Sequence, residues 1–386
     1  MGKVEDLQAR ASERTGLDAP GDDTWQEGLG VLVDSLERHD VLESGREFVY
    51  GMYVDALANR LRVVDYLQQH PETRDERIER PLVVLGMPRT GTTVASYLLD
   101  QDPRRRSLLN WEASDSVPPA TSSTLRTDPR CLAKKAELDA FARALEEAGN
   151  GMAHWEDADG PTECIFLHNQ DFKALLWDAW MPDATYYRWL FDTDMTSAYE
   201  YERSVLQILQ SRAPGVWSLK MPSHSVHIET LLATFPDVRI VWAHRDPFRA
   251  TASLCSVWTD TKAMVLGGAY DPERLGASAT EQMRVHVERP LRARERIGAD
   301  RFFDLHYADL VRDPIAQMRA LYEWAGDEFE PDLEQRMQAW LDRNPQDRFG
   351  SRRYAFEQFG LDRTELESVF DEYLSTFDIE LEGPTT

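Results

Sequence analysis

Cysteine and long apolar runs are both scarce in this sequence. Its 386 residues include only Cys131, Cys164 and Cys255, which lie far apart and form no Cys-x-x-Cys pair. This spacing predicts neither a disulfide framework nor a structural zinc site. No stretch approaches the ~20 consecutive apolar residues that a membrane-spanning helix needs, and the first residues contain no apolar signal core. We therefore expect a cytoplasmic protein with no transmembrane segment and no metal site.

Positive charge is also in short supply. The chain has 43 Lys and Arg residues against 68 Asp and Glu residues, which gives a formal net charge of −25. Such a charge repels nucleic acid and anionic membranes, so we expect no nucleic-acid partner. Any anionic ligand must then bind in a local basic pocket. The length allows one large α/β domain with insertions or two smaller domains that share a core.

The apolar pattern changes near residue 80. Before that point, apolar residues recur at steps of three to five positions, which is typical of an amphipathic helix. These residues are Phe48, Met52, Leu57, Leu61, Val64 and Leu67. Pro81 then ends the helical region. We expect a helical N-terminal extension over residues 1–80 that packs on the core, and one domain over residues 81–386.

The domain repeats the order strand, turn, helix. Residues 81–85 form a uniformly apolar run, as a strand buried on both faces of a parallel sheet requires. The same order returns with a strand at 238–242, a turn at 244–247 and a helical pattern at 248–257. Another strand is expected over 301–306. The predicted fold is α/β, a P-loop-like parallel sheet flanked by helices, with the helical extension and helical insertions.

The turn after the first strand has the composition of an anion-binding loop. Residues 86–93 read Gly-Met-Pro-Arg-Thr-Gly-Thr-Thr, and a helix start there aims backbone N–H groups at one point. The spacing matches the nucleotide-binding Gly-x-x-x-x-Gly-Lys-Ser/Thr loop, but Thr92 replaces the Lys that reaches the phosphates. Arg89 instead places a forked cation inside the loop. These features disfavour a P-loop kinase or nucleotide hydrolase, and the structural alternative is a tight glycine turn with a surface Arg.

Residues 88–93 resemble the phosphosulfate loop of sulfotransferases, Pro-Lys/Arg-Ser/Thr-Gly-Thr-Thr, in the Arg-containing version also seen in tyrosylprotein sulfotransferases. The resemblance, to the bacterial type of the family, implies transfer of a sulfuryl group from 3′-phosphoadenosine 5′-phosphosulfate (PAPS) to an acceptor hydroxyl. Family members are often dimers, so a homodimer is an expectation for this chain. The resemblance also assigns the 5′-phosphosulfate to Arg89, Thr90, Gly91, Thr92 and Thr93.

A second set of residues resembles the family's site for the 3′-phosphate. In the family, an Arg that ends a strand and a Ser eight residues later hold this phosphate, and Arg245 and Ser253 reproduce the pair. An Arg at the carboxyl end of a parallel strand lies where open α/β folds bind ligands. The segment Tyr-Ala-Asp-Leu beginning at Tyr307 resembles the family's Tyr-Glu-Asp-Leu, whose Tyr lies near the adenosine. Ala308 departs from that pattern, and core packing is the alternative role for Tyr307.

Residues 350–354, Gly-Ser-Arg-Arg-Tyr, resemble a further cofactor segment of bacterial members. The resemblance implies that Arg352 and Arg353 add positive charge near the 3′-phosphate. Solvated surface arginines are the equal alternative.

Sulfuryl transfer needs in-line positioning, stabilisation of developing charge and a base for the acceptor hydroxyl. Residues 219–224, Leu-Lys-Met-Pro-Ser-His, resemble the Leu-Lys-x-Pro-x-His string of bacterial sulfotransferases. The resemblance makes Lys220 the candidate for stabilising the bridging oxygen, and His224 a candidate acceptor contact or base. A buried Lys stem and a hydrogen-bonded loop His are the structural alternatives.

Two carboxylates compete with His224 for the role of base. Glu112, in Asn-Trp-Glu, resembles the base of tyrosylprotein sulfotransferases and is the first candidate. Glu163 opens an expected helix, where it can be the base or a first-turn Glu favoured by the helix dipole. The sequence leaves this choice open.

Many aromatic residues fall within residues 155–189. Most are expected in the core, and the rest can line an apolar pocket, which favours a hydrophobic small molecule or lipid as acceptor. A kinase or nucleotide hydrolase and a non-catalytic nucleotide-binding scaffold remain as alternatives. The joint presence of Arg89, Lys220 and a nearby carboxylate favours catalysis.

Overall fold

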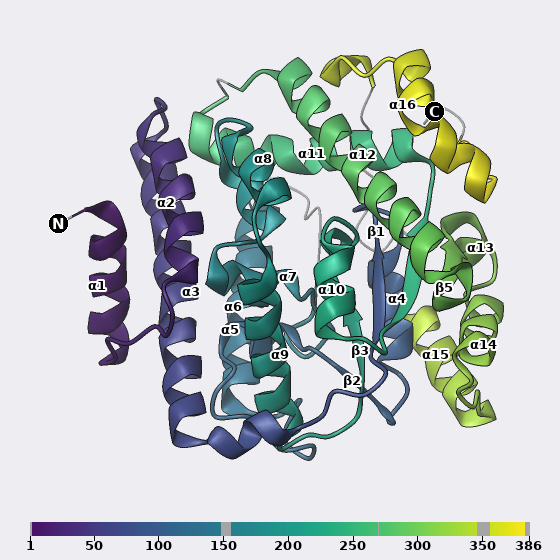
Figure 1. The fold of residues 1–386 in the computed structure, drawn as a ribbon, viewed down its shortest axis with the longest axis horizontal. Helices are drawn as coiled ribbons and strands as arrows, with labels where there is room; N and C mark the ends of the chain where they lie inside the picture. Colours follow the sequence, from purple (N-terminus) through teal and green to yellow (C-terminus); the bar gives the residue numbers. More distant parts are fainter. Residues whose placement is uncertain (1, 148–155, 269, 346–355, 383–386) are drawn as a thin grey trace.

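The computed structural model describes residues 2–147, 156–268, 270–345 and 356–382. A five-stranded parallel sheet with strand order β2-β3-β1-β4-β5 lies at the centre of the fold (Figure 1). Its strands are β1 (Leu82–Gly86), β2 (Arg105–Ser107), β3 (Val216–Lys220), β4 (Arg239–His244) and β5 (Phe302–His306). The chain places strands on both sides of β1, so the crevice beyond the carboxyl end of β1 is where such a sheet binds ligands.

The uniform apolar run of β1 reflects burial on both faces of the sheet. All five β1 residues are buried. Val83 and Leu85 join a large hydrophobic cluster on one face, whereas Leu82 and Val84 join a smaller cluster on the other. A strand with this environment has no polar face, which is why its sequence does not alternate.

Helices cover both faces of the sheet. The smaller cluster is completed by α4 (Thr92–Leu99), α13 (Tyr307–Arg312), α14 (Pro314–Ala325) and α15 (Pro331–Arg343). The larger cluster takes in α8 (Thr185–Asp192), α9 (Thr196–Gln210), α10 (Ile228–Thr234), α11 (Pro247–Leu266), α12 (Pro272–Ile297) and α16 (Arg363–Phe377). The insertion between β2 and β3 also contains α5 (Asn110–Ser114), α6 (Pro129–Glu147) and α7 (Ile165–His168).

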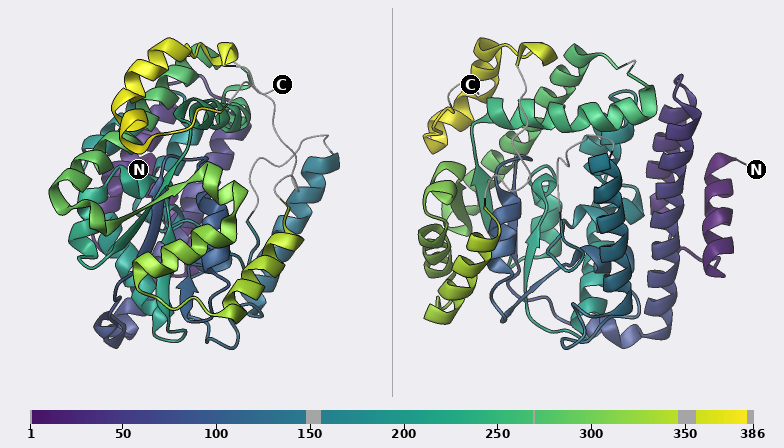
Figure 2. Two further views of the ribbon diagram at one scale, coloured as in Figure 1. Left: turned by 90° about the vertical axis from the view of Figure 1, so that its right-hand side faces the viewer. Right: turned by 180° about the vertical axis from the view of Figure 1, so that it is seen from behind.

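The N-terminal region is helical, as its periodicity predicts. It forms α1 (Lys3–Thr15), α2 (Thr24–Glu37), α3 (Glu43–Gln69) and a short 3-10 turn over Pro71–Asp75. The three helices stand side by side at one end of the molecule, opposite α13 to α15, in the front view and from behind (Figures 1 and 2). Leu29 and Tyr53 belong to the same core cluster as Val83 of β1, so the helices share a core with the sheet. The domain boundary at residue 80 stays a prediction.

Four of the described helices begin with the pair Asp-Pro, and one of them is α6, where Asp128 accepts the backbone N–H of Arg130 at 2.9 Å and Pro129 follows it. In the other three, Asp246, Asp271 and Asp313 each accept a backbone N–H of the helix that follows, and each is succeeded by a proline in the first turn. A short acceptor side chain at this position and a proline after it favour helix initiation. The pair Asp246-Pro247 turns the chain directly after β4. Among all the described helices, none is both long and apolar enough to cross a membrane.

Candidate active site

The anion-binding loop lies between β1 and α4. Arg89 and Gly91 have φ angles of 70° and 87°, in the left-handed region. The Thr90 hydroxyl donates to the carbonyl of Met87 at 2.8 Å and closes the turn. A Cβ added to Gly91 would lie 2.9 Å from Cδ2 of Tyr307, so only glycine fits here without displacing that ring. Thr92 and Thr93 begin α4, so the positive end of the helix points at this loop.

The two halves of the predicted cofactor site meet around this loop. Arg89 Nε donates to Ser253 Oγ on α11 at 3.1 Å, and Arg245 donates to the backbone carbonyl of Arg89 at 2.8 Å. The Arg245 guanidinium lies over the Tyr307 ring, 4.0 Å from its centroid. The structure therefore brings Arg89, Arg245, Ser253 and Tyr307 together at the carboxyl ends of β1, β4 and β5.

A carboxylate from the C-terminal segment binds in the same place. Arg245 Nε donates to Glu382 Oε1 at 2.6 Å, and its terminal nitrogen donates to Oε2 at 2.9 Å. The backbone N–H of Glu382 donates to the Asp246 carboxylate at 2.8 Å. This two-pronged geometry is the one in which an arginine binds a phosphate. No motif in the sequence pointed to Glu382.

Lys220 ends β3, where it pairs with Val84 of the central strand. Its ammonium donates to Glu156 Oε1 at 2.9 Å and to Glu163 Oε1 at 3.1 Å, and its side chain is 1% exposed. Burial lowers the pKa of Lys220, but the two carboxylates outweigh this effect and raise it to about 12. Lys220 is therefore a cation at neutral pH.

The two carboxylates differ in their surroundings. The Glu156 side chain is 5% exposed, and its second oxygen accepts a hydrogen bond from the Thr162 hydroxyl. The Glu163 side chain is 20% exposed. Glu163 thus offers a carboxylate to the surface while it contacts Lys220. Sequence reasoning missed Glu156 because it lies in a polar segment without a recognisable motif.

Glu112 lies in a different environment. One terminal nitrogen of Arg106 donates to both oxygens of Glu112, at 2.5 and 2.7 Å, and the Leu109 N–H approaches Oε2 at 3.4 Å. Glu112 is 1% exposed and Arg106 is 4% exposed. The structure thus places Glu112 in a buried ion pair with Arg106. Its role as base stays a prediction.

His224 is fully buried in a 3-10 turn, Pro222–Ser225, behind Lys220. Its Nδ1 lies 3.0 Å from the Tyr199 hydroxyl. Burial lowers the pKa of His224 to about 4, although the charge of Glu202 opposes the shift. The imidazole is therefore neutral at pH 7, and no part of it reaches the surface. Its role as acceptor contact or base stays a prediction, and Arg352 and Arg353 lie outside the described residues.

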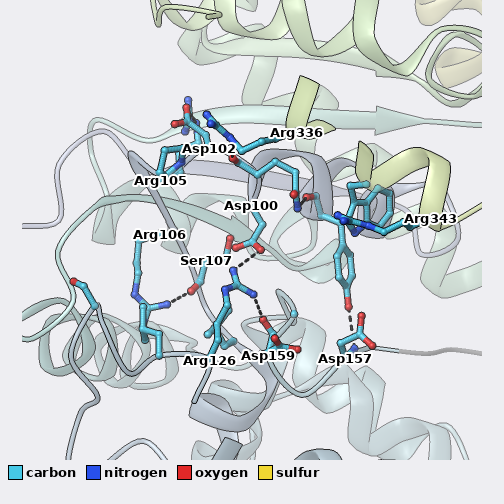
Figure 3. A pocket seen from close by; sticks show the side chains of 18 residues that line it. Asp100, Asp102, Arg105, Arg106, Ser107, Arg126, Asp157, Asp159, Arg336 and Arg343 are labelled. Atoms are coloured by element: carbon cyan, nitrogen blue, oxygen red, sulfur yellow. Dashed lines mark hydrogen bonds and ion pairs between the residues drawn. The ribbon is translucent and has the colours of Figure 1, made fainter. Parts of the chain in front are cut away.

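A cavity of about 590 Å³ lies beside the edge strand β2, and its lining includes Arg106, the partner of Glu112, and Asp157, the neighbour of Glu156 (Figure 3). Several charged groups around it are neutralised locally, as in the 2.7 Å ion pair between Arg126 and Asp100. Burial raises the pKa of Asp100, and Arg126 opposes that shift. None of the predicted site residues lines this cavity. The candidate active site is therefore the cluster at the carboxyl ends of the strands.

Residues 81–331 match the model of the Sulfotransferase family. The chain belongs to the sulfotransferase family. Its fold is similar over 99% of its length to sulfotransferase STF9 from Mycobacterium avium, with 52% identity, 98% coverage of that chain and a TM-score of 0.93. Sulfotransferase STF1 from Mycobacterium tuberculosis H37Rv is 28% identical, with a TM-score of 0.84 over 96% of this chain and 99% of that one. The predicted family and α/β fold class are confirmed.

Curated relatives are more distant. The omega-hydroxy-beta-dihydromenaquinone-9 sulfotransferases Stf3 of Mycobacterium bovis and Mycobacterium tuberculosis are each 27% identical over 257 residues. The match covers 64% of this chain and 62% of each relative, which is less than two thirds of their length. Sulfuryl transfer, rather than the phosphoryl transfer of a P-loop kinase, is the chemistry of the family to which this chain belongs.

Proposed function

We propose that this sulfotransferase-family chain transfers a sulfuryl group from PAPS to a hydroxyl group on a hydrophobic, lipid-like acceptor. The proposal is carried by one arrangement. The loop around Arg89, the Arg245 fork and the Tyr307 ring converge at the carboxyl ends of three strands, and Lys220 ends the neighbouring strand β3, where Glu156 and Glu163 contact its ammonium.

The donor fits the groups in the first half of this arrangement. Backbone N–H groups at the start of α4 and the Arg89 guanidinium would hold the 5′-phosphosulfate, as anion-binding helix starts do. Arg245 and Ser253 would hold the 3′-phosphate. The Glu382 carboxylate supports this assignment, because it already engages Arg245 as a doubly hydrogen-bonded anion. Tyr307 would lie beside the adenosine.

The second half supplies the chemistry. PAPS provides an activated sulfuryl group whose bridging S–O bond breaks as the acceptor O–S bond forms. Lys220, held as an ammonium, would donate a hydrogen bond to the bridging oxygen and offset the charge that develops on the leaving phosphate. Glu163 would accept the proton of the acceptor hydroxyl. Glu156 would remain the internal counter-ion of Lys220.

Glu163 is preferred over Glu112 as base on two grounds. Glu163 contacts Lys220 and retains exposed surface, whereas both oxygens of Glu112 accept hydrogen bonds from Arg106. With both oxygens engaged by Arg106 and only 1% of its surface exposed, Glu112 is screened from an acceptor hydroxyl, whereas Lys220 contacts Oε1 of the partly exposed Glu163.

The acceptor class rests on the relatives rather than on the aromatic residues of 155–189. Phe172, Trp177, Tyr186 and Tyr187 are buried in the core, as expected for most of that group. The Stf3 relatives act on a hydroxylated menaquinone, and this supports a long hydrophobic alcohol as acceptor. A homodimer stays a prediction.

The test is a transfer assay with radiolabelled PAPS and two acceptor sets, isoprenoid or long-chain alcohols and simple sugars. We expect labelled sulfate ester on the hydrophobic alcohols, strongly reduced in Arg89→Ala and Glu163→Gln. Arg363→Ala serves as the matched arginine control, because Arg363 is an exposed residue at the start of α16. Transfer to sugars alone contradicts the acceptor class. A protein that binds the product 3′-phosphoadenosine 5′-phosphate but transfers label to no acceptor contradicts the catalytic assignment.

A further inference from the structure

Three metal-ligating side chains meet in the core behind Lys220. Cys164 precedes α7, Glu202 lies on α9 and His224 lies in the 3-10 turn after β3. All three residues are 0% exposed. A thiol sulfur, a carboxylate oxygen and an imidazole nitrogen from these residues all lie within 4.8 Å of one another. Such a combination in a sealed interior is unusual because buried polar groups normally have partners.

Two of the atoms that face this point have no nitrogen or oxygen partner. Glu202 Oε1 and His224 Nε2 are both buried, and they lie 3.9 Å apart, too far for a direct hydrogen bond. The Cys164 thiol hydrogen-bonds to the Glu202 carboxylate, so the sulfur is held at the same point. A buried carboxylate oxygen and an imidazole nitrogen without such partners are costly. A positively charged group between them would satisfy both.

The opposite side of each ligand is already held. The second oxygen of Glu202 lies 2.7 Å from His168 Nε2, and Nδ1 of His224 lies 3.0 Å from the Tyr199 hydroxyl. Metal-binding histidines and carboxylates in proteins have such outer partners, which fix the orientation of the ligating atom. When Nδ1 of His224 donates to Tyr199, Nε2 presents its lone pair toward Glu202 and Cys164.

We propose that Cys164, Glu202 and His224 bind a zinc ion. A thiolate, a carboxylate and a neutral imidazole together balance the charge of Zn²⁺, which a sealed core requires, and this mixture of sulfur, nitrogen and oxygen ligands suits zinc. Zinc–ligand distances of about 2.0–2.3 Å place tetrahedral ligands about 3.3–3.6 Å apart. The 3.9 Å separation between His224 Nε2 and Glu202 Oε1 therefore shortens by a few tenths of an ångström on binding, and the sulfur, which lies within 4.8 Å of both, moves inward by up to about 1 Å. Binding releases the thiol proton of Cys164 to solvent.

The ion would have a structural role. Cys164 directly follows Glu163, and its N–H donates to the carbonyl of Lys220 at 3.0 Å. His224 lies in the turn that Lys220 leads into. The ion therefore ties together the two segments that carry Glu163 and Lys220 and touches no reacting atom. The spacing of the cysteines did not indicate it because the ligands come from three distant parts of the sequence.

Metal analysis of the purified chain, with any affinity tag removed, tests the proposal. Plasma mass spectrometry should find about one zinc per chain, lost in Cys164→Ser and in His224→Gln. Cys255→Ser is the matched control, since Cys255 is also a buried free thiol but lies on α11 outside the cluster. That variant should keep its zinc. Zinc that persists in Cys164→Ser overturns the proposal.

Cobalt substitution provides a measurement that does not depend on the folding of a variant. The wild-type chain is stripped with a chelator, which should lower its melting temperature, and is then loaded with Co²⁺. A thiolate-to-cobalt charge-transfer band in the near ultraviolet, competed away by Zn²⁺, is the expected result. A chain that is purified without metal and gives no such band overturns the proposal, and an ordered water then accounts for the two unsatisfied atoms. Neither readout requires sulfuryl transfer, so failure here leaves the proposed function untouched.

Discussion

Arg245 and Glu382 form a two-pronged ion pair at the carboxyl end of β4, with N–O distances of 2.6 and 2.9 Å. The side chains are 17% and 34% exposed. Because the proposed 3′-phosphate needs the same nitrogen atoms of Arg245, the phosphate and the Glu382 carboxylate cannot both bind there. The C-terminal segment therefore competes with the donor.

Glu382→Gln should tighten the binding of 3′-phosphoadenosine 5′-phosphate. A partly exposed ion pair contributes at most about 1 kcal/mol, so the expected gain is about fivefold in Kd. Calorimetric titration measures it. Glu380→Gln is the matched control because Glu380 is an exposed glutamate in the same segment, and its affinity should not change. Equal affinities for all three proteins would show that Glu382 does not compete.

Glu163→Gln should lower kcat by about 10²-fold or more, because the amide cannot accept the acceptor proton. The Kd for 3′-phosphoadenosine 5′-phosphate should stay within about twofold of wild type. Glu112→Gln should act on stability, since it removes the buried partner of Arg106, and such changes cost about 3–5 kcal/mol. Kinetics and urea unfolding of both variants separate the two roles. A kcat loss confined to Glu112→Gln would make Glu112 the base.

Gly91→Ala should damage the phosphate loop itself. The new Cβ would meet Tyr307 at 2.9 Å and would occupy a φ of 87°. We expect binding of 3′-phosphoadenosine 5′-phosphate to weaken by at least about tenfold. Gly268→Ala is a close control because its φ is 85° and nothing lies within 4 Å of an added Cβ. It should cost about 1 kcal/mol of stability and leave binding intact. Similar affinities in the two variants would argue against close packing of Tyr307 on the loop.

The burial of His286 should lower the free energy of unfolding in mild acid. Burial, with help from Arg289, lowers its pKa from 6.5 to about 4, although a hydrogen bond to the Gln282 carbonyl opposes the shift. Below pH 6.5 the unfolded chain binds a proton that folded His286 excludes, so stability falls as the pH drops from 6.5 toward 4. This histidine contributes up to about 3 kcal/mol of that fall. Urea unfolding of wild type and His286→Gln across this range should give a shallower dependence for the variant, and parallel curves would contradict the assignment.

The sequence predicted the parts of the sheet that carry strong apolar signals. β1, β4 and β5 lie within two residues of their expected positions. β2 and β3 were not predicted because β2 is only Arg-Arg-Ser and β3 mixes Trp with Ser and Lys. The Arg side chains of β2 are tolerated in the fold because they pair with acidic groups, such as Arg106 with Glu112. Such strands depend on side-chain pairs between residues that are distant in the sequence. Hydrophobic periodicity does not detect these pairs.

The candidate site shows the same contrast between residues that local sequence motifs indicate and residues that only the fold brings together. The resemblance of short segments to sulfotransferase motifs predicted Arg89, Arg245, Ser253, Tyr307 and Lys220 as site residues, and in the structure they lie at the carboxyl edge of the sheet. Glu156 and Glu382 were missed because each becomes part of the site only through a partner far away in the sequence, Lys220 and Arg245 respectively. The proposed preference for Glu163 over Glu112 as base also depends on the structure, because exposure and the Arg106 ion pair differ between two carboxylates that look alike in sequence.

Recognition of the 3′-phosphate is the central claim, and a calorimetric titration tests it most directly. Wild type and Arg245→Ala are titrated with 3′-phosphoadenosine 5′-phosphate, with adenosine 5′-monophosphate, which lacks only the 3′-phosphate, and with ATP. The account predicts that wild type binds the 3′-phosphorylated nucleotide at least about tenfold more tightly than the other two, and that Arg245→Ala loses this preference. Equal or tighter binding of ATP, or a preference that survives in Arg245→Ala, would contradict it.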